Sequence, residues 1–539
     1  MKGILGFRQR RRMRRKLSLL SIVSLILLML MGGKAKAQDA RAVLQAAVKS
    51  MGTDSLKCIT YSGTGGYVGI VGQNYAPGDD WPKVELANFS RTINFDGRAM
   101  REEQVRRQGN YPQRGGGGIP LQGEQRQINL VSGNYAWNLQ GANVNPQPAA
   151  AQTRQLEIWL DPHGFLKGAI AAKDLVSFER YEGGPARDGG FGEKRKILAY
   201  TMGKFRIQGS IDDRDEVVRV QTFVPTPLLG DTVEEKTYGA YKQFGGVKFP
   251  TNFHHHTNWD HEERPQGYFG VRDGGHNSFG ITIANVQPNV CGEAITVPEA
   301  VQKAAIPPVR VESQRLADGV FYLTGGSHHS VAVGFSDFVT VVEAPLDEAR
   351  SLAVIAEVKR LFPDKRIKYV VSTHHHFDHS GGLRTYVHEG AIPVAHRDIV
   401  PYYYYAVMDL APRTLEPDRL SLYPPDEFQE TFVLEAVQND KYTISDGTRI
   451  MDLHLVEGNP HAVGMLMVHL PKERILVEAD LFNPPAPNAS YPATPSRAAT
   501  SLYNNVQRLK LQVDQIAPIH GRLVPWGEFA KFASSGKSN

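Results

Sequence analysis

Residues 368–382 read KYVVSTHHHFDHSGG, and this stretch decides the fold of the second half of the chain. The first six residues, with Tyr369, Val370 and Val371 in the middle, are typical of a buried strand, and the two closing glycines allow a tight turn into a helix. Alternate side chains of an extended segment point the same way, so His374 and His376 can share one cation. Where the chain then curls towards the helix, Asp378 and His379 can turn to a second cation.

Three later loops offer the ligands that such a pair of cations still lacks. His461 lies in the loop GNPHAVG between two strands, Asp480 ends the strand RILVEAD, and His520 closes the late strand QIAPIHGR. Imidazole nitrogens and carboxylate oxygens are the ligands that zinc and related divalent ions take in proteins. The sequence therefore predicts a metal centre at which four separate loops converge.

The motif HxHxDH followed by His, Asp and His at these intervals resembles the metallo-β-lactamase-fold hydrolases, whose fold is an αββα sandwich. The resemblance covers roughly residues 310–535 and implies a site for two divalent metal ions. Its implied ligands are His374, His376 and His461 for the first ion, Asp378, His379 and His520 for the second, and Asp480 as the bridge between them. Zinc is the expected metal, and iron or manganese fit the same ligands.

The resemblance also implies a mechanism and a class of reaction. Two divalent ions lower the pKa of a shared water towards about 7, so a metal-bridged hydroxide would attack an ester-like bond such as a thioester or a lactone. Asp378 can both ligate and relay a proton, which makes it the candidate catalytic acid or base. β-Lactam hydrolysis is an alternative, but cysteine-liganded β-lactamases of this fold carry Cys where Asp480 stands, and no cysteine follows Cys291. A ligand-binding envelope protein with a secondary metal domain is the other alternative.

Residues 38–291 are predicted to form a mostly antiparallel, β-rich domain whose role the sequence does not specify. Alternating apolar runs, broken by Gly, Pro and Asn, recur at short spacing, which is typical of such sheets. We expect RQLEIWL, residues 154–160, to be one of these strands, and we expect helices at residues 40–52 and 166–176. The run at residues 230–253 is similar to the curved-sheet domains of periplasmic lipoprotein-carrier proteins.

A proline-bearing linker is expected at residues 292–309, and the pattern changes after it. From residue 310 to residue 535, short apolar strands alternate with amphipathic helices such as residues 347–362, which predicts a layered α/β organisation. The fold class is therefore α/β, with a C-terminal αββα sandwich preceded by the antiparallel β-rich domain.

The positive charge of the chain is concentrated at its start. The 539 residues carry a net charge of +5, but residues 1–37 hold ten Lys or Arg and no acidic residue, so the remainder carries −5. This basic start, an apolar run of about 15 residues and the small residues before Gln38 predict a signal peptide. The protein is then periplasmic or secreted; an uncleaved membrane anchor is the alternative.

These features also bear on partners. An acidic mature chain with an export signal argues against nucleic acid as a partner. Beyond the leader no apolar stretch is long enough to span a bilayer, so no stable membrane insertion is expected after signal cleavage. We expect a small-molecule substrate, and an envelope ligand or partner is the further candidate for the N-terminal domain.

Several other residues have two interpretations. The triplet His254–His256 is expected to lie in a solvated loop. The pair His328–His329 fits either an exposed turn or a substrate contact, and Tyr402–Tyr405 could line a pocket or simply pack. Cys58 and Cys291 could pair in an oxidising compartment or remain two buried thiols. Structural roles in helix or strand bodies are expected for His388, His396, His454 and His469.

Overall fold

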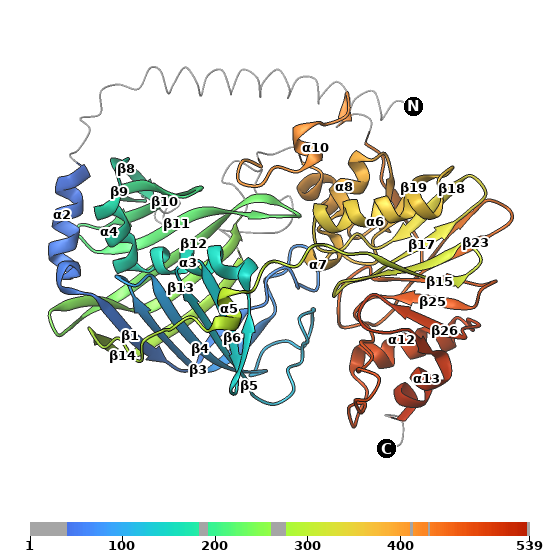
Figure 1. The fold of residues 1–539 in the computed structure, drawn as a ribbon, viewed down its shortest axis with the longest axis horizontal. Helices are drawn as coiled ribbons and strands as arrows, with labels where there is room; N and C mark the ends of the chain where they lie inside the picture. The colour runs from blue at the N-terminus through green and yellow to red at the C-terminus, as the bar shows by residue number, and fades with distance from the viewer. Residues whose placement is uncertain (1–39, 183–191, 260–275, 410–412, 429–431, 536–539) are drawn as a thin grey trace.

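The computed structural model describes residues 40–182, 192–259, 276–409, 413–428 and 432–535. Two β-rich halves lie side by side, the first coloured blue to green and the second yellow to red (Figure 1). The predicted α/β class is confirmed, with an antiparallel N-terminal sheet and a layered C-terminal half. The predicted signal peptide, residues 1–37, lies outside the described residues. In the described part of the chain, no helix is both long and apolar enough to cross a bilayer.

The N-terminal half is built on one antiparallel sheet. Its strands are β1 (Cys58–Gly63), β2 (Gly66–Gly69), β3 (Lys83–Asn94), β4 (Ala99–Arg107), β5 (Gln125–Ser132), β6 (Tyr135–Gln140), β7 (Asn143–Pro146), β8 (Val176–Glu182), β9 (Glu193–Met202), β10 (Phe205–Ile211), β11 (Val217–Thr226), β12 (Gly230–Phe244), β13 (Val247–Trp259) and β14 (His276–Pro288). Among the described residues, the order is β7-β6-β5-β4-β3-β1-β14-β13-β12-β11-β10-β9-β8, with β2 against β3 and β14.

Three helices pack on this sheet and enclose the N-terminal core. They are α2 (Ala40–Met51), α3 (Ala151–Leu160) and α4 (Pro162–Ala171), accompanied by the 3-10 turns η1 (Thr53–Ser55) and η2 (Pro148–Ala150). Leu44 of α2, Leu156 of α3 and Phe165 of α4 share one buried cluster with Tyr61 and Phe249 of the sheet. The predicted first helix is confirmed, while the second begins earlier than expected and ends before the residues KDLV.

The expectation of a strand at residues 154–160 is wrong, because these residues lie in α3. Their apolar side chains alternate as in a strand, which misled the prediction. In the helix, the guanidinium of Arg154 donates to the backbone oxygens of Leu130 and Trp137 at 3.0 and 2.8 Å. These two partners lie on β5 and β6, so tertiary contacts override the local pattern.

The triplet His254–His256 is not a solvated loop, as expected, but part of β13. The ring of His255 is buried and stacks on Phe279 of β14, with the two centroids 4.8 Å apart. His254 is half-buried, and its Nε2 lies 2.6 Å from Oδ1 of Asn277. Alternation along a strand thus sends the middle histidine into the core and its neighbours to the other face.

A disulfide closes the N-terminal sheet. Cys58, at the start of β1, is bonded to Cys291, which follows β14, and the two strands pair directly in antiparallel register. Of the two interpretations of these cysteines, the structure supports pairing. The bond links positions 233 residues apart and so restricts a long loop of the unfolded chain.

Replacing both cysteines with alanine is expected to lower the free energy of unfolding by about 2–5 kcal/mol, because the unfolded chain regains the entropy of that loop. Chemical denaturation of the wild type and of the Cys58→Ala/Cys291→Ala variant measures the difference. A thiol reductant should destabilise the wild type by a similar amount and leave the variant unchanged. A wild type that ignores the reductant would contradict the pairing.

The segment expected as a linker runs against the N-terminal sheet. It contains the short helix α5 (Glu299–Gln302), and the buried Val301 of this helix packs against Ile128, Leu130 and Trp137. Along the chain, β14 is the last strand of the first sheet, and the next strand begins at Glu312.

The C-terminal half contains two sheets. The first holds β15 (Glu312–Ala317), β16 (Val320–Thr324), β17 (Ser330–Gly334), β18 (Phe338–Val342), β19 (Arg366–Val371), β20 (Ile392–His396) and β21 (Glu435–Val437). The second holds β22 (Lys441–Ser445), β23 (Ile450–Leu455), β24 (Leu466–Leu470), β25 (Ile475–Glu478), β26 (Gln515–Pro518) and β27 (Val524–Pro525). In the described residues each sheet follows chain order.

Helices cover the outer faces of the two sheets, and this gives four layers (Figure 1). The helices are α6 (Glu348–Leu361), α7 (Phe377–Ser380), α8 (Leu383–His388), α9 (Val400–Tyr402), the π-helix η3 (Tyr403–Val407), α10 (Arg419–Leu422), α12 (Arg497–Arg508) and α13 (Trp526–Ser534). Ile355 of α6 packs with Val341 of β18. Val333 of β17, Val468 of β24 and Phe529 of α13 belong to the core between and below the sheets. These contacts confirm the predicted αββα sandwich.

The topology gathers several strand ends at one edge of this sandwich. β18 and β19 are parallel neighbours, and so are β25 and β26. The carboxyl ends of parallel neighbours meet at the same edge of a sheet, and polar side chains in the loops that follow them therefore lie close together. The motif at residues 374–379 follows β19, Asp480 follows β25, and His520 follows β26.

Candidate metal centre

One cluster of ligands gathers His374, His376, His461 and Asp480, whose candidate donor atoms all lie within 4.8 Å of one another. His374 and His376 come from the loop after β19, and His374 Nε2 lies 3.1 Å from His376 Nδ1. His461, from the loop after β23, places its Nε2 3.0 Å from Oδ2 of Asp480. The three histidines are buried and the side chain of Asp480 is 9% exposed, so the cluster is largely shielded from bulk water.

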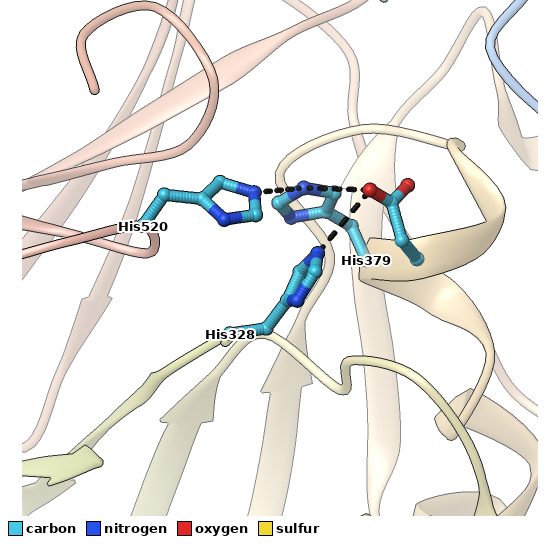
Figure 2. A group of neighbouring side chains, drawn as sticks. His328, His379 and His520 are labelled. Atoms are coloured by element: carbon cyan, nitrogen blue, oxygen red, sulfur yellow. Dashed lines mark hydrogen bonds and ion pairs between the residues drawn. The ribbon is translucent and has the colours of Figure 1, made fainter. Parts of the chain in front are cut away.

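A second cluster lies beside the first and contains Asp378, His379 and His520 together with His328. The Nε2 atoms of His379 and His520 are 3.1 Å apart, and Nε2 of His328 lies 3.2 Å from Oδ2 of Asp378. Figure 2 shows the three rings turned towards one another from three separate segments of the chain. His328 reaches this point from the turn between β16 and β17.

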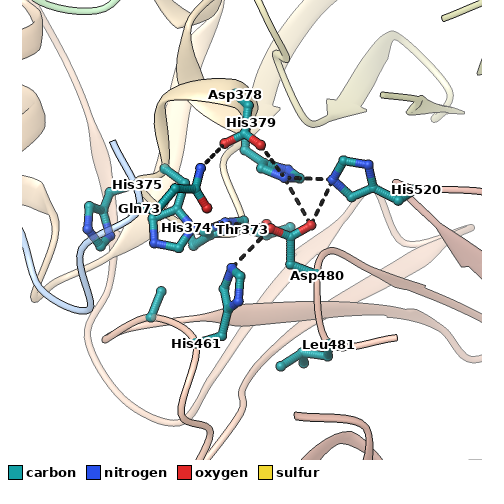
Figure 3. Close-up of polar contacts among 12 residues, drawn as sticks. Gln73, Thr373, His374, His375, Asp378, His379, His461, Asp480, Leu481 and His520 are labelled. Atoms are coloured by element: carbon teal, nitrogen blue, oxygen red, sulfur yellow. Dashed lines mark hydrogen bonds and ion pairs between the residues drawn. The ribbon is translucent and has the colours of Figure 1, made fainter. Parts of the chain in front are cut away.

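Asp480 lies between the two clusters and contacts both (Figure 3). Its Oδ1 is 2.7 Å from Nε2 of His520 and 3.1 Å from Nε2 of His379. Its Oδ2 is 3.0 Å from Nε2 of His461 and 3.7 Å from Nε2 of His374. The backbone of Asp480 has a φ of 60°, a left-handed conformation that Asp tolerates better than most residues. The structure thus brings all seven predicted ligand residues together around one carboxylate.

The donor atoms fit divalent cations. His461 Nε2 and Asp480 Oδ1 are buried at contact distance from other polar atoms, yet neither makes a hydrogen bond of acceptable geometry. Two imidazole nitrogens 3.1 Å apart, as in both histidine pairs described above, cannot both carry a proton. At least one lone pair of each histidine pair therefore points into its cluster. Together with Nε2 of His461 and Oδ1 of Asp480, these buried acceptors suit a bound cation.

The outward ring nitrogens of three ligand histidines have partners of their own. His374 Nδ1 lies 3.0 Å from Oγ1 of Thr373, and His379 Nδ1 lies 2.7 Å from Oε2 of Glu343. His376 Nε2 lies 2.9 Å from a backbone oxygen of the N-terminal half. Such partners fix the tautomer and the ring orientation of metal-binding histidines.

Burial and neighbouring charges set the protonation of the ligands. Burial lowers the pKa of His374 and of His376 well below the usual value, so both rings stay in the neutral, ligand-competent form. Burial would also lower the pKa of His379, but the carboxylates beside it raise that pKa well above the usual value. Burial tends to raise the pKa of Asp378, yet the hydrogen bond with His328 holds it below the usual range. Without a cation, the centre therefore combines neutral rings at His374 and His376 with a His379 whose charged form is favoured and an ionised Asp378.

Sequence reasoning missed two side chains of this centre. His328, for which the sequence predicts an exposed turn or a substrate contact, is only 8% exposed and lies within the second cluster. Glu343 follows β18, is fully buried, and joins Nδ1 of His379 to the backbone nitrogen of Thr373. The sequence feature that could have identified Glu343 is its position directly after β18, the strand that pairs with β19.

Other predicted positions lie outside the centre. Tyr402 and Tyr403 pack in the core, and the hydroxyl of Tyr403 donates to the backbone oxygen of His374. His388 lies in α8, His396 in β20, His454 in β23 and His469 in β24, as expected for structural residues. Among the described residues, Asp452, His454 and His469 form a further His/Asp group, but Lys441 already pairs with Asp452 at 2.9 Å.

Glu343→Gln is expected to weaken metal binding by about 10–100-fold, because this buried carboxylate orients the ring of His379 and strengthens it as a ligand. Competition with a chromophoric chelator measures the affinity. Glu357→Gln is the matched control, since Glu357 pairs with Arg360 on the surface of α6. Equal affinities for the two variants would show that Glu343 does not act on the ligands.

The family comparison agrees with this geometry. Residues 323–500 match the family model described as the metallo-beta-lactamase superfamily, a range that includes every centre residue named above except His520 and those of the N-terminal half. The resemblance of the N-terminal half to lipoprotein-carrier domains stays a prediction. No curated protein matches the sequence of the chain.

Several solved structures are similar to part of the chain. A metallo-beta-lactamase from Pontibacter korlensis is 14% identical, with 43% of this chain and 100% of that chain covered and a TM-score of 0.32. The DIM-1 metallo-beta-lactamase is 14% identical over 42% and 97% of the two chains, with a TM-score of 0.31. FIM-1 from Pseudomonas aeruginosa, in its mono-zinc form, is 18% identical over 43% and 99%, with a TM-score of 0.30. By the match to the family model, residues 323–500 form a domain of the metallo-beta-lactamase superfamily, a family of metal-dependent hydrolases.

Proposed function

We propose that this protein is an exported hydrolase that uses two divalent metal ions to cleave an ester-like bond, such as a thioester or a lactone. The observation that carries the proposal is the contact of one carboxylate, Asp480, with histidines of both clusters. Zinc is the expected metal because histidine and carboxylate ligands suit it, and iron or manganese would fit the same donors.

The ligand residues would divide between the two ions as the clusters do. His374, His376 and His461 would hold the first ion, and Asp378, His379, His520 and His328 would surround the second. When bound, divalent ions lower the pKa of water and polarise the oxygen of the bond to be cleaved. Asp480 would fix the position of the two sites relative to each other, and its carboxylate would offset part of the positive charge of the two ions.

Asp378 is our candidate for proton transfer. One of its oxygens faces His328, and the side chain is 33% exposed, whereas His374 and His379 are fully buried. His520 is the other partly exposed ligand, at 21%. A substrate would therefore approach the second cluster, where the carboxylate of Asp378 can accept a proton from water and pass it to the leaving group.

Export rests on two observations of different kinds. The basic and apolar start of the chain is typical of a signal peptide. The disulfide between Cys58 and Cys291 supports an oxidising compartment, because such bonds are rare where thiols are kept reduced. We propose a periplasmic or secreted location on these grounds.

Metal analysis of the purified full-length chain, combined with a substrate panel, tests the proposed function. Two ions per chain and turnover of a thioester or lactone are expected, with activity lost to a chelator and restored by zinc. His376→Ala should lose the first ion and His520→Ala the second. Turnover confined to β-lactams or phosphodiesters would overturn the ester-like assignment, and one ion per wild-type chain would overturn the dinuclear one.

A further inference from the structure

A loop of the N-terminal half reaches the metal centre. In the segment between β2 and β3, the side-chain amide of Gln73 donates from Nε2 to Oδ1 of Asp378 at 2.8 Å (Figure 3). The backbone oxygen of Asn74 accepts from Nε2 of His376 at 2.9 Å. Gln73 and Asn74 are both buried, although about 300 positions separate them from these partners in the sequence.

The same loop is fixed to the C-terminal half on either side of Gln73 and Asn74. The backbone nitrogen of Phe377 donates to the oxygen of Gly72 at 3.2 Å, and that of Val463 donates to the oxygen of Tyr75 at 2.7 Å. Phe377 lies inside the HxHxDH motif and Val463 two residues after His461. The loop is therefore bonded to two of the segments that carry the ligands.

A second N-terminal loop supports the first. The backbone nitrogen of Gly115 donates to the oxygen of Pro460, next to His461, and the nitrogen of Gly116 donates to the oxygen of Gln73, both at 2.9 Å. A Cβ atom on Gly116 would lie 2.8 Å from Cε1 of His376 and 2.0 Å from Oε1 of Gln73. Only glycine fits here, so the two loops and the ligand ring are in close contact.

The hydrogen bonds select which ligand atoms face the centre. Because Asn74 accepts the proton on Nε2 of His376, the Nδ1 of that ring keeps its lone pair and faces Nε2 of His374. Because Gln73 occupies Oδ1 of Asp378, the other oxygen faces His328 and the second cluster. Outer partners of this kind orient metal ligands and tune their affinity.

We propose that the N-terminal β domain completes the active site. The segment Gly72–Tyr75 positions Asp378 and His376 and forms one wall of the substrate site, so the hydrolase domain depends on the other half of the chain for metal affinity and turnover. This inference rests on the proposed function for the meaning of turnover, but its effect on metal affinity is independent of the substrate.

Two variants in the full-length protein test it, each by metal affinity as well as by rate. Because the added methyl group meets the amide of Gln73 as well as the ring of His376, Gly116→Ala should weaken binding of the second ion to some extent and of the first ion by about tenfold or more. Gln73→Ala should leave that ion in place, weaken the second, and lower kcat more than it raises KM. Gly118→Ala, in the same loop, is the control: a Cβ there meets nothing within 4 Å, although its φ of 78° makes the change at least as strained locally.

Thermal melting establishes whether each variant folds. If Gly116→Ala does not fold, Gln73→Ala still tests the inference. Folded variants that keep wild-type affinity for both ions and a wild-type kcat would overturn the inference. If the wild type binds metal but hydrolyses none of the panel, the proposed function fails, while the affinity differences still decide whether the N-terminal loop positions the ligands.

Discussion

Asp480→Asn is expected to lower hydrolysis by more than 100-fold and to prevent the two ions from binding together. Loss of an outer partner of a metal ligand already costs about 10–100-fold. Asp480 is in direct contact with histidines of both clusters, so its loss acts on both ions at once. The change keeps the size of the side chain and removes one negative charge and one acceptor oxygen. The remaining histidines would then bring two cations close together without the carboxylate between them.

Metal content by mass spectrometry, measured beside the rate, checks this expectation. Asp514→Asn is a matched control, because Asp514 lies in the same domain and pairs with Arg474 at the surface. The control should keep two ions and the wild-type rate. An Asp480→Asn protein that still holds two ions and turns over at the wild-type rate would show that the two clusters do not share this carboxylate.

The sequence predicted those parts of the site that depend on local pattern. His374, His376, Asp378 and His379 lie within six residues, so their geometry follows from one strand end and one turn. The more distant ligands followed from the resemblance, because a known fold supplies the order of its loops. Their convergence on Asp480 depends on the parallel pairing of β25 and β26, which one sequence alone does not reveal.

The parts that were missed depend on contacts between distant segments. Nothing near Gln73 in the sequence marks it as a neighbour of Asp378, because the contact exists only when the two halves are folded against each other. The turn before His328 has the composition of an exposed loop, and residues 325–327 are exposed, but the ring of His328 is buried and contacts His520 and Asp378. Burial of a polar residue is a tertiary property, so local propensity does not predict it.

The two errors in the N-terminal half have a related cause. Short-range pattern predicts a strand for residues 154–160 and a loop for His254–His256, whereas these residues lie in α3 and β13. In both cases contacts with the sheet determine the secondary structure: Arg154 donates to the backbone of β5 and β6, and His255 stacks on Phe279. Amphipathic patterns of seven residues or fewer fit more than one element, and packing selects among them.

Asp378→Ala is expected to lower kcat by about 10²–10⁴-fold while the first ion stays bound, because this residue serves the second cluster and proton transfer only. His374, His376 and His461 are untouched by the change, so one ion per chain should remain.

Asp378→Asn separates the two roles, since its amide oxygen can still accept from Gln73 while the proton-accepting carboxylate is gone. Metal content and the pH dependence of kcat for both variants test this. If Asp378→Asn binds two ions and loses the rate, the residue acts in proton transfer; if both variants lose one ion and the rate together, it acts as a ligand. Wild-type rates in both variants would remove Asp378 from the mechanism. The proton-transfer role would then pass to His520, the other partly exposed ligand of the second cluster in the described part of the chain.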